Sequence, residues 1–256
     1  QDVLDFTYFG GIYRDCWLVA HNPVFITDPN FEDEVAGGGL FVAYDKVSDA
    51  SAEVLLQTHV RNASAKAFTG VVEYELQQAD GKQVAFLNDK IQVRPGKAVT
   101  SKDKVTVKNP MLWSPETPTL YNLIVRIRDK EGNVIDGYRR RIGIRTVRLD
   151  FTPTHTPENP GRFCFIVNNE KVFARGSNWT PMDALHSRDP QWLDRTFGLV
   201  TDLNCNMIRC WGGNVYEDTR FYELCDENGV MVWQDFGMGC TFYSQRYEFA
   251  RAIERE

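Results

Sequence analysis

The chain has 256 residues, 43% of them hydrophobic, and its 29 Lys and Arg against 35 Asp and Glu give a net charge of −6 at pH 7. This length suffices for one large core or two to three smaller ones. The mild acidity and the lack of a basic block argue against nucleic acid and anionic lipid as partners. No apolar run approaches the roughly 18 residues of a membrane-spanning helix.

The cysteines and histidines do not have the spacing of a metal site. The six cysteines include no Cys-x-x-Cys pair, and the four histidines cluster neither with one another nor with the cysteines. Cys205, Cys210 and Cys225 lie inside apolar segments, which indicates buried free thiols. We therefore expect no metal.

The first 27 residues contain two aromatic, alternating segments, at positions 6–9 and 16–19, with Gly10 and Gly11 between them. Both segments predict short strands.

About seven short strands follow at regular spacing between residues 28 and 149. They are expected at residues 39–44, 53–60, 70–76, 90–93, 104–107, 120–127 and 137–145. The Asp80-Gly81 pair is a hairpin signal. About seven strands in about 110 residues are typical of an immunoglobulin-like sandwich. The run of three arginines at 139–141 indicates a solvated or interdomain strand face rather than an anion site.

From residue 150 on, after an irregular segment rich in Pro and Thr, strands and helices alternate. Short apolar runs at 171–174, 206–211 and 229–233 predict strands buried on both faces of a parallel sheet. Helices are expected at 190–203, with Asp189 as N-cap and Pro190 at N1, and at 218–228, with Gly229 at C′. A third helix is expected from about residue 247. Two consecutive βα units predict a parallel sheet, either doubly wound or closed into a barrel.

Each expected parallel strand is followed by polar or aromatic residues. Asn178 and Trp179 follow the first, Arg209 and Trp211 end the second, and Asp235 follows the third. In α/β barrels the C-terminal strand ends build the active site, so these five residues are candidates by position.

Three segments of this region resemble the opening of the catalytic barrel of glycoside hydrolase family 2. They read GSNWTPMDALHSRD, NMIRCWGGNVYED and FYELCDENGVMVWQDF. The Arg-x-Trp-Gly-Gly pattern at 209–213 is most similar to the β-mannosidase subgroup. The Ser-His-Tyr-Pro run typical of the β-galactosidases of the family is absent. Upstream, GGIYRDCW (10–17), NPMLWSP (109–115) and GIRTV (143–147) resemble segments of the sandwich domains of the family.

The resemblance implies a multidomain chain. Residues 1–27 would be the last strands of a jelly-roll-like N-terminal β-sandwich, and residues 28–149 an all-β immunoglobulin-like sandwich. Residues 150–256 would be the first βα units of a (β/α)8 TIM barrel.

The resemblance also implies roles for the five candidates. Trp211 would form a wall or hydrogen bond at the −1 sugar, and Asn178 and Trp179 would line the pocket. Arg209 would hold or orient the catalytic carboxylates, and Asp235 would bond sugar hydroxyls or pair with Arg209. The alternatives are core packing for the two tryptophans and a structural ion pair for Arg209 and Asp235.

An aspartate from the preceding sandwich reaches the substrate in this family. Asp5 is the best positional match and Asp2 the next, and the alternative for both is an exposed carboxylate on a strand edge.

A retaining glycosidase needs two carboxyl groups about 5–5.5 Å apart. In family 2 both are glutamates on later barrel strands, the first within an Asn-Glu pair. Here Asn169-Glu170 precedes the first expected strand, so we interpret it as a hairpin turn. A barrel needs about 250 residues, and 107 follow Leu149. We therefore expect the catalytic glutamates downstream of Glu256 and no activity in the 256 residues alone.

The sequence thus predicts part of a retaining exo-β-glycosidase that needs no cofactor and acts on a carbohydrate, most closely on terminal β-mannosides. β-Galactosidase, β-glucuronidase and exo-glucosaminidase specificities stay open, as does a non-catalytic carbohydrate-binding or scaffold protein. A nucleotide-binding domain would need a Gly-rich first turn that is not present. An open sheet edge would allow self-association into a homo-oligomer, and we expect a periplasmic or secreted protein.

Overall fold

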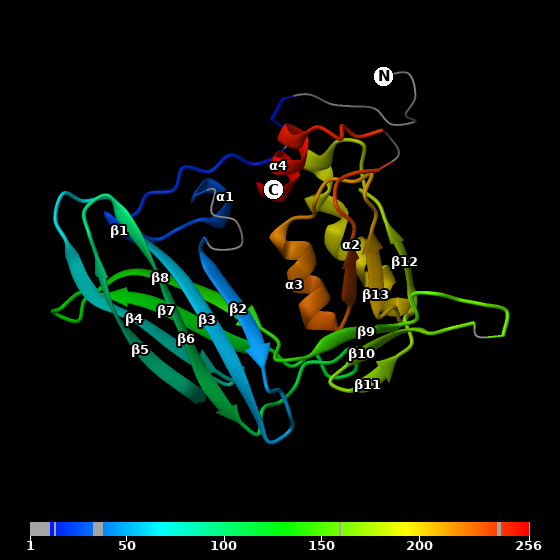
Figure 1. The fold of residues 1–256 in the computed structure, drawn as a ribbon, viewed down its shortest axis with the longest axis horizontal. Helices are drawn as coiled ribbons and strands as arrows, with labels where there is room; N and C mark the ends of the chain where they lie inside the picture. Colours follow the sequence, from blue (N-terminus) through cyan, green and yellow to red (C-terminus); the bar gives the residue numbers. More distant parts are fainter. Residues whose placement is uncertain (1–10, 13, 33–37, 159, 240–241, 256) are drawn as a thin grey trace. The chain divides into compact units, whose positions relative to one another are not determined.

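A computed structural model describes residues 11–12, 14–32, 38–158, 160–239 and 242–255 (Figure 1). The chain divides into two compact units. One comprises Gln1–Leu18, Trp113–Pro118 and Val147–Ser244, and the other Val19–Leu112, Thr119–Thr146 and Gln245–Glu256. Each unit is described by itself.

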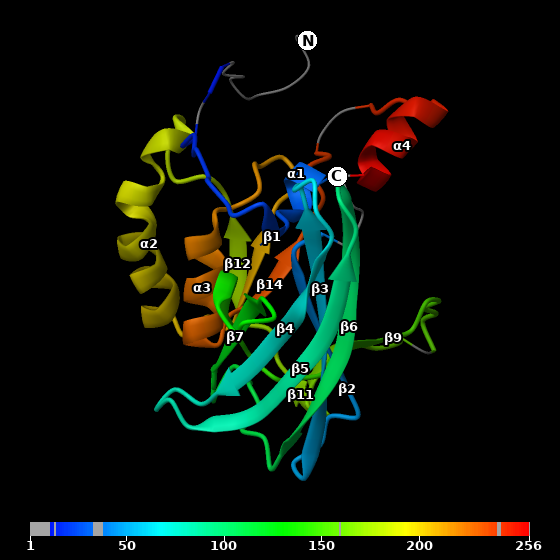
Figure 2. The ribbon, with the colours of Figure 1, turned by 90° about the vertical axis from the view of Figure 1, so that its left-hand side faces the viewer.

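The second unit is built around an antiparallel β-sandwich (Figures 1 and 2). In one sheet β3 pairs with three strands, β1, β2 and β6. The other sheet has the order β5-β4-β7-β8. The strands are β1 (Val24–Ile26), β2 (Leu40–Asp45), β3 (Ser51–Asn62), β4 (Phe68–Gln77), β5 (Gln83–Val93), β6 (Lys97–Lys108), β7 (Tyr121–Arg128) and β8 (Val134–Ile142). Two short or terminal helices, α1 (Pro29–Glu32) and α4 (Tyr247–Arg255), belong to the same unit.

The sandwich core follows from the period-two pattern of its strands. In β3, Val54 and Leu56 are buried while the residues between them are half-buried. In β7, Leu123, Val125 and Ile127 are buried in the same alternation. One face of each sheet is therefore apolar and packs inward, as in other two-sheet sandwiches.

Most of the expected sandwich strands are confirmed, with two corrections at the N-terminal side. Residues 14–22 form no strand, so the strand expected at 16–19 is wrong; Trp17 and Leu18 are exposed. The strand expected at 6–9 lies outside the described residues. In addition, β1 pairs with β3, so residues 24–26 extend the sandwich, although the sequence assigned them to the preceding domain.

In the other unit, β9 (Val147–Phe151), β10 (Phe163–Val167) and β11 (Glu170–Val172) form a small antiparallel sheet. Asn168 and Asn169 connect β10 to β11 with positive φ angles of 49° and 68°. Two such residues in succession are typical of a tight hairpin turn. The interpretation of Asn169-Glu170 as a hairpin turn is confirmed.

The expected first parallel strand is misplaced. Residues 170–172 pair antiparallel with β10, and the parallel strand is instead β12 (Gly176–Trp179), which pairs with β13 (Met207–Cys210). β13 pairs in parallel with β14 (Met231–Gln234). The apolar run at 171–174 is the stronger strand signal in the sequence. The first parallel strand is nevertheless residues 176–179, because these pair with β13, about 30 residues away, and the sequence does not record such pairing.

Two helices cover one face of the parallel sheet (Figure 2). They are α2 (Pro190–Asp202) and α3 (Thr219–Asn228), preceded by a 3-10 turn, η1 (His186–Arg188). Phe197 of α2 and Phe221 of α3 pack with Ile208 and Cys210 of β13 in one buried cluster. The other face is more exposed, so the expectation of strands buried on both faces is not met in this unit.

The helix boundaries are those the sequence predicted, within one residue. Gly229 follows α3 with φ +70°, and a Cβ there would lie 2.1 Å from the carbonyl oxygen of Pro115. Both facts require glycine. Asp189 occupies the N-cap position of α2, but its carboxylate accepts bonds from the backbone N–H of Asp183 and from His186 instead of capping the helix.

No helix among the described residues is long and apolar enough to cross a membrane.

Candidate functional site

The parallel strands place polar side chains on the face opposite the helices. The register pairs Asn178 of β12 with Arg209 of β13, and Arg209 with Trp233 of β14. Because neighbours on either side of Arg209 in β13, Ile208 and Cys210, pack on the helix side, Arg209 points to the opposite face. This face is polar near the C-terminal ends of the strands.

Arg209 joins two other predicted residues into one hydrogen-bonded cluster. Its Nη2 donates to Asp235 Oδ2 at 2.6 Å and its Nε to Asp235 Oδ1 at 3.3 Å, while its Nη1 donates to Asn178 Oδ1 at 3.2 Å. The Arg209 side chain is 40% exposed, so water screens the ion pair. The two bonds from Arg209 to Asp235 therefore act mainly on geometry: they fix the planes of the guanidinium and the carboxylate.

Asp235 is also held by the backbone around it. Its N–H donates to the carbonyl of Cys210 at 3.1 Å, and its Oδ2 accepts from the N–H of Gly212 at 3.3 Å. The carboxylate thus receives donors from Arg209 and from the loop that follows β13. Of the two roles that the sequence left open for Asp235, pairing with Arg209 is the one seen in the structure.

The two glycines after Trp211 lie in close contact with their surroundings. A Cβ on Gly213 would lie 2.3 Å from the indole of Trp211, and one on Gly212 would lie 2.6 Å from the carbonyl oxygen of Phe236. A Cβ on Gly239 would meet the backbone of Gly213 at 2.7 Å. The loops after β13 and β14 are therefore in contact, and the half-buried Trp211 lies over a glycine.

Trp179 was expected to line a sugar pocket, but it lies in the core. It is 6% exposed, belongs to the buried cluster on the helix side, and packs against Phe221 with ring centroids 5.0 Å apart. Asn178 and Trp179 are successive residues of one strand and point to opposite faces. The correction for Trp179 is core packing, the alternative that the sequence had left open.

The chain was compared with known proteins. The model of the family "Glycosyl hydrolases family 2" matches residues 38–145. β-Mannosidase B of Aspergillus flavus is 36% identical over 226 residues, which cover 82% of this chain and 26% of that protein. The chain belongs to glycosyl hydrolase family 2.

Other comparisons agree with this family 2 membership. β-Mannosidase of Bos taurus is 28% identical over 257 residues, covering 96% of this chain and 27% of that protein. The solved structure of a β-D-mannosidase from Dictyoglomus thermophilum matches 84% of this chain and 26% of its own, with 31% identity and a TM-score of 0.70. A β-glucuronidase structure from Bacteroides uniformis matches 98% of this chain with a TM-score of 0.81 and 24% identity, which supports the fold alone.

The family 2 chain spans about a quarter of the length of the curated relatives it matches. One predicted site residue, Asp5, lies outside the described residues, and so does Asp2. A substrate contact by Asp5 stays a prediction.

Sequence reasoning missed Glu217 in this family 2 chain. Its Oε1 accepts a hydrogen bond from the indole Nε1 of Trp179 at 3.0 Å. Burial raises the pKa of the Glu217 carboxyl; the Trp179 bond opposes this shift, and the negative charge of Asp189 adds to it. The only sequence signal was an acidic residue that ends the otherwise apolar run Val215-Tyr216, and the partner is 38 residues away.

The prediction of buried free thiols in this family 2 chain is confirmed for two of the three cysteines. Cys210 and Cys225 are buried free thiols and Cys205 is partly buried. Burial raises the pKa of Cys210 to about 12 and raises that of Cys225 further. Both side chains are therefore uncharged apolar packing groups at neutral pH.

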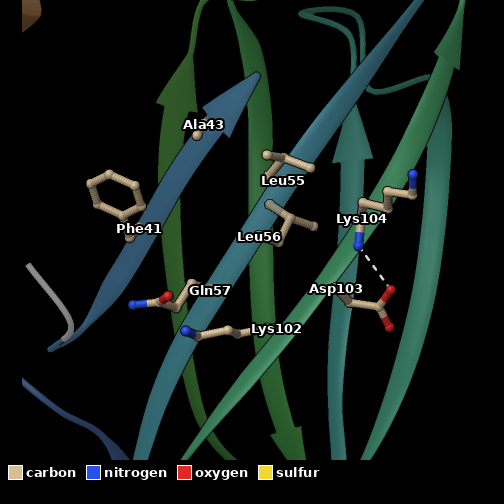
Figure 3. A pocket seen from close by; sticks show the side chains of 8 residues that line it. All are labelled: Phe41, Ala43, Leu55, Leu56, Gln57, Lys102, Asp103 and Lys104. Atoms are coloured by element: carbon tan, nitrogen blue, oxygen red, sulfur yellow. Dashed lines mark hydrogen bonds between the residues drawn. The ribbon is translucent and has the colours of Figure 1, made fainter. Parts of the chain in front are cut away.

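A groove of about 480 Å³ lies in the sandwich unit, over β2, β3 and β6 (Figure 3). It is lined by Phe41, Ala43, Leu55, Leu56, Gln57, Lys102, Asp103 and Lys104. None of the predicted site residues lines it, and it presents no pair of carboxyl groups. We assign no catalytic chemistry to it.

Proposed function

We propose that this chain is the sugar-recognition part of a retaining exo-β-glycosidase that removes terminal β-mannosyl residues. The observation that carries the proposal is the cluster of Asn178, Arg209 and Asp235 beside Trp211, at the C-terminal ends of parallel strands. The β-mannosidase names of relatives that are 28–36% identical support the sugar class.

We also propose that β12, β13 and β14 with α2 and α3 are the first units of a (β/α)8 barrel. Parallel order in chain sequence and polar residues at the C-terminal strand ends support this arrangement. Residues 28–149 would then be the immunoglobulin-like domain and residues 1–27 the end of the preceding jelly-roll-like sandwich. The pairing of β1 with β3 supports a boundary a few residues earlier.

In this proposal the residues of the cluster bind and orient. The fork between Arg209 and Asp235 keeps the guanidinium in one plane. From there its remaining N–H donors would orient a neighbouring catalytic carboxylate. Asn178 would offer its amide to a sugar hydroxyl, and the indole of Trp211 would supply the apolar wall on which a sugar ring packs. The two catalytic glutamates would come from the rest of the protein.

A β-glucuronidase is a rival, because β-glucuronidase structures match most of this chain, but the cluster does not favour it. A glucuronide carries a carboxylate, which needs a cation that is not already neutralised. Arg209 is the cation of this cluster, and Asp235 accepts two of its bonds. The pair suits an uncharged sugar better.

Exposed apolar side chains support a further surface of contact. Phe151 and Phe163 of the small antiparallel sheet and Phe173 are 55%, 57% and 80% exposed. We propose that the remainder of the protein or a second copy covers them.

The test is hydrolysis of a panel of p-nitrophenyl β-glycosides by the protein at its natural length and by residues 1–256 alone. We expect preference for the mannoside with retention of anomeric configuration, and no turnover by the shorter chain. Preference for the galactoside or glucuronide would contradict the specificity. Binding of sugars without turnover of any glycoside would instead support a carbohydrate-binding protein.

A further inference from the structure

We propose that Glu217 is a positioning residue of the sugar site: through the indole of Trp179 it fixes the loop of residues 211–217 that carries Trp211. The proposal rests on the proposed function insofar as Trp211 touches the sugar. The contacts that support it do not depend on that function.

Two side chains of this loop hold the same residue of β12. In the middle of the loop, Asn214 Nδ2 donates to the carbonyl oxygen of Trp179 at 2.8 Å, and the Asn214 N–H donates to the carbonyl oxygen of Trp211 at 3.0 Å. At its end, Glu217 Oε1 accepts from Nε1 of Trp179 at 3.0 Å. The loop is therefore attached to Trp179 at two points, and the bond from Asn214 joins Trp211 to the first of them.

The residue to which the loop is attached is itself fixed. Trp179 is 6% exposed and packs against Phe221, a fully buried residue of α3. An indole N–H in such a place needs an acceptor, because an unmade bond at a buried donor costs about 1–3 kcal/mol. Glu217 supplies that acceptor, and this bond ties the loop to a residue of the core.

Further contacts join this loop to its neighbours. The hydroxyl of Tyr216 accepts a hydrogen bond from the N–H of Gly237 at 3.0 Å, in the loop that follows Asp235. Arg14 donates to the carbonyl oxygen of Tyr216 and lies 3.6 Å from the carboxylate of Asp218. The attachment to Trp179 thus also restrains the loop that contains Asp235, through the bond between Tyr216 and Gly237.

The surroundings of Glu217 explain why a positioning role needs this side chain. Asp189 and Asp218 disfavour its negative charge and Arg14 favours it, while burial raises the pKa of its carboxyl. Burying a carboxylate beside two other acids destabilises the folded state unless hydrogen bonds compensate. A glutamine should keep the acceptor without the charge, and the acidic neighbours can accept from its amide.

The experiment compares E217L, which removes the acceptor, with E217Q, which keeps it. E116Q, at an exposed glutamate of the same unit, is the matched control. The protein at its natural length is labelled with 5-fluorotryptophan, and the ¹⁹F signal of Trp211 is assigned with W211F. KM and kcat for the p-nitrophenyl mannoside are measured on the same samples.

We expect E217L to shift or broaden the Trp211 signal and to raise KM about tenfold, the effect of one lost hydrogen bond. E217Q and E116Q should leave the Trp211 signal in place and KM within about twofold. W179F removes the donor of the same bond and should move the Trp211 signal as E217L does. It also serves if E217L does not fold.

An unchanged Trp211 signal in both E217L and W179F would overturn the proposal. The same holds if E217Q perturbs Trp211 as strongly as E217L does. If the protein hydrolyses no glycoside, the proposed function fails, while the ¹⁹F signal still decides the role of Glu217. If the ¹⁹F signal moves and KM does not, Glu217 positions the loop but Trp211 does not contact the sugar.

Discussion

Glu73 in the sandwich and Glu217 in the βα unit are both shielded carboxyl groups, and their surroundings shift their pKa values in opposite directions. Arg128 donates to Glu73 from Nε at 2.8 Å and Nη2 at 3.1 Å, and Arg126 donates at 2.6 Å. These arginines, Arg128 first, lower the pKa of Glu73. Glu217 has one neutral donor and two acidic neighbours, and burial raises its pKa.

The opposite pKa shifts follow from how the fold of each region places charged groups beside its glutamate. In the sandwich, regular antiparallel pairing places Arg126 directly opposite Glu73, so that neutralisation is part of the strand register. In the βα unit, Asp235 and Glu217 lie on loops that follow parallel strands, and their side chains meet residues 26 and 38 positions away. In the sandwich, ion pairs link neighbouring strands. In the βα unit, the ion pair of Arg209 and Asp235 lies at the ends of the strands.

The chain offers a direct way to observe the two regions separately. All six tryptophans lie in the unit that contains the parallel sheet, at positions 17, 113, 179, 192, 211 and 233. Tryptophan fluorescence therefore reports the unfolding of that unit, while far-UV circular dichroism reports both units.

The largest expected effect is that of G176A. A Cβ at this position of β12 would lie 1.6 Å from the carbonyl oxygen of Met207, so β12 and β13 cannot keep their spacing. We expect a loss of about 3 kcal/mol or more, seen in tryptophan fluorescence during urea unfolding. The matched control is G137A in β8, where the nearest atom is at 3.4 Å and the change should stay within about 0.5 kcal/mol. Equal effects of the two substitutions would contradict the geometry described for β12.

The next effect concerns activity. R209M removes the donors that hold Asp235 and Asn178, so we expect kcat/KM to fall about a hundredfold, equivalent to about 2.7 kcal/mol. R139M, at an exposed arginine of β8, is the control and should leave kcat/KM unchanged. Steady-state kinetics on the protein at its natural length measures both. A loss below threefold for R209M would place the cluster outside the sugar site.

E73Q should destabilise the sandwich by about 1 kcal/mol at pH 7, because it weakens charge-assisted bonds that the partly exposed arginines share with water. The folded pKa of Glu73 is lowered, so its contribution is present above the unfolded pKa near 4.5 and is lost as pH falls through the folded value. Melting followed by circular dichroism between pH 7 and pH 3 should show the difference between wild type and E73Q disappear at the acidic end.

The smallest effect has the opposite sign. The folded pKa of Glu217 is raised, so this group stabilises the fold below its unfolded pKa, and that contribution is lost as pH rises through the folded value. E217Q keeps the bond to Trp179 and removes the charge, so we expect a slightly higher melting temperature at pH 7 and none of this gain at pH 4. Tryptophan fluorescence melts provide the measurement. A lower melting temperature for E217Q at pH 7 would show that the charge itself stabilises the unit.

Comparison of Asn178 with Trp179 shows where reading the sequence succeeded and where it failed. The rule that functional residues follow parallel strands correctly brought Asn178, Arg209 and Asp235 together. It misdirected Trp179 because the strand was expected at 171–174, which left both residues in a loop. Once the strand is at Gly176–Trp179, the two point to opposite faces, since a strand alternates its side chains.

The sequence by itself determined the sandwich strands, the two helices and their ends. These depend on local features: alternation of apolar residues, helical spacing, Pro190 at the start of α2 and Gly229 after α3. Only the tertiary structure decided which segment became the first parallel strand, which way Trp179 points, and that Glu217 meets it. Those outcomes depend on pairing and burial between residues more than 30 positions apart, and no local pattern records the free energy of such contacts.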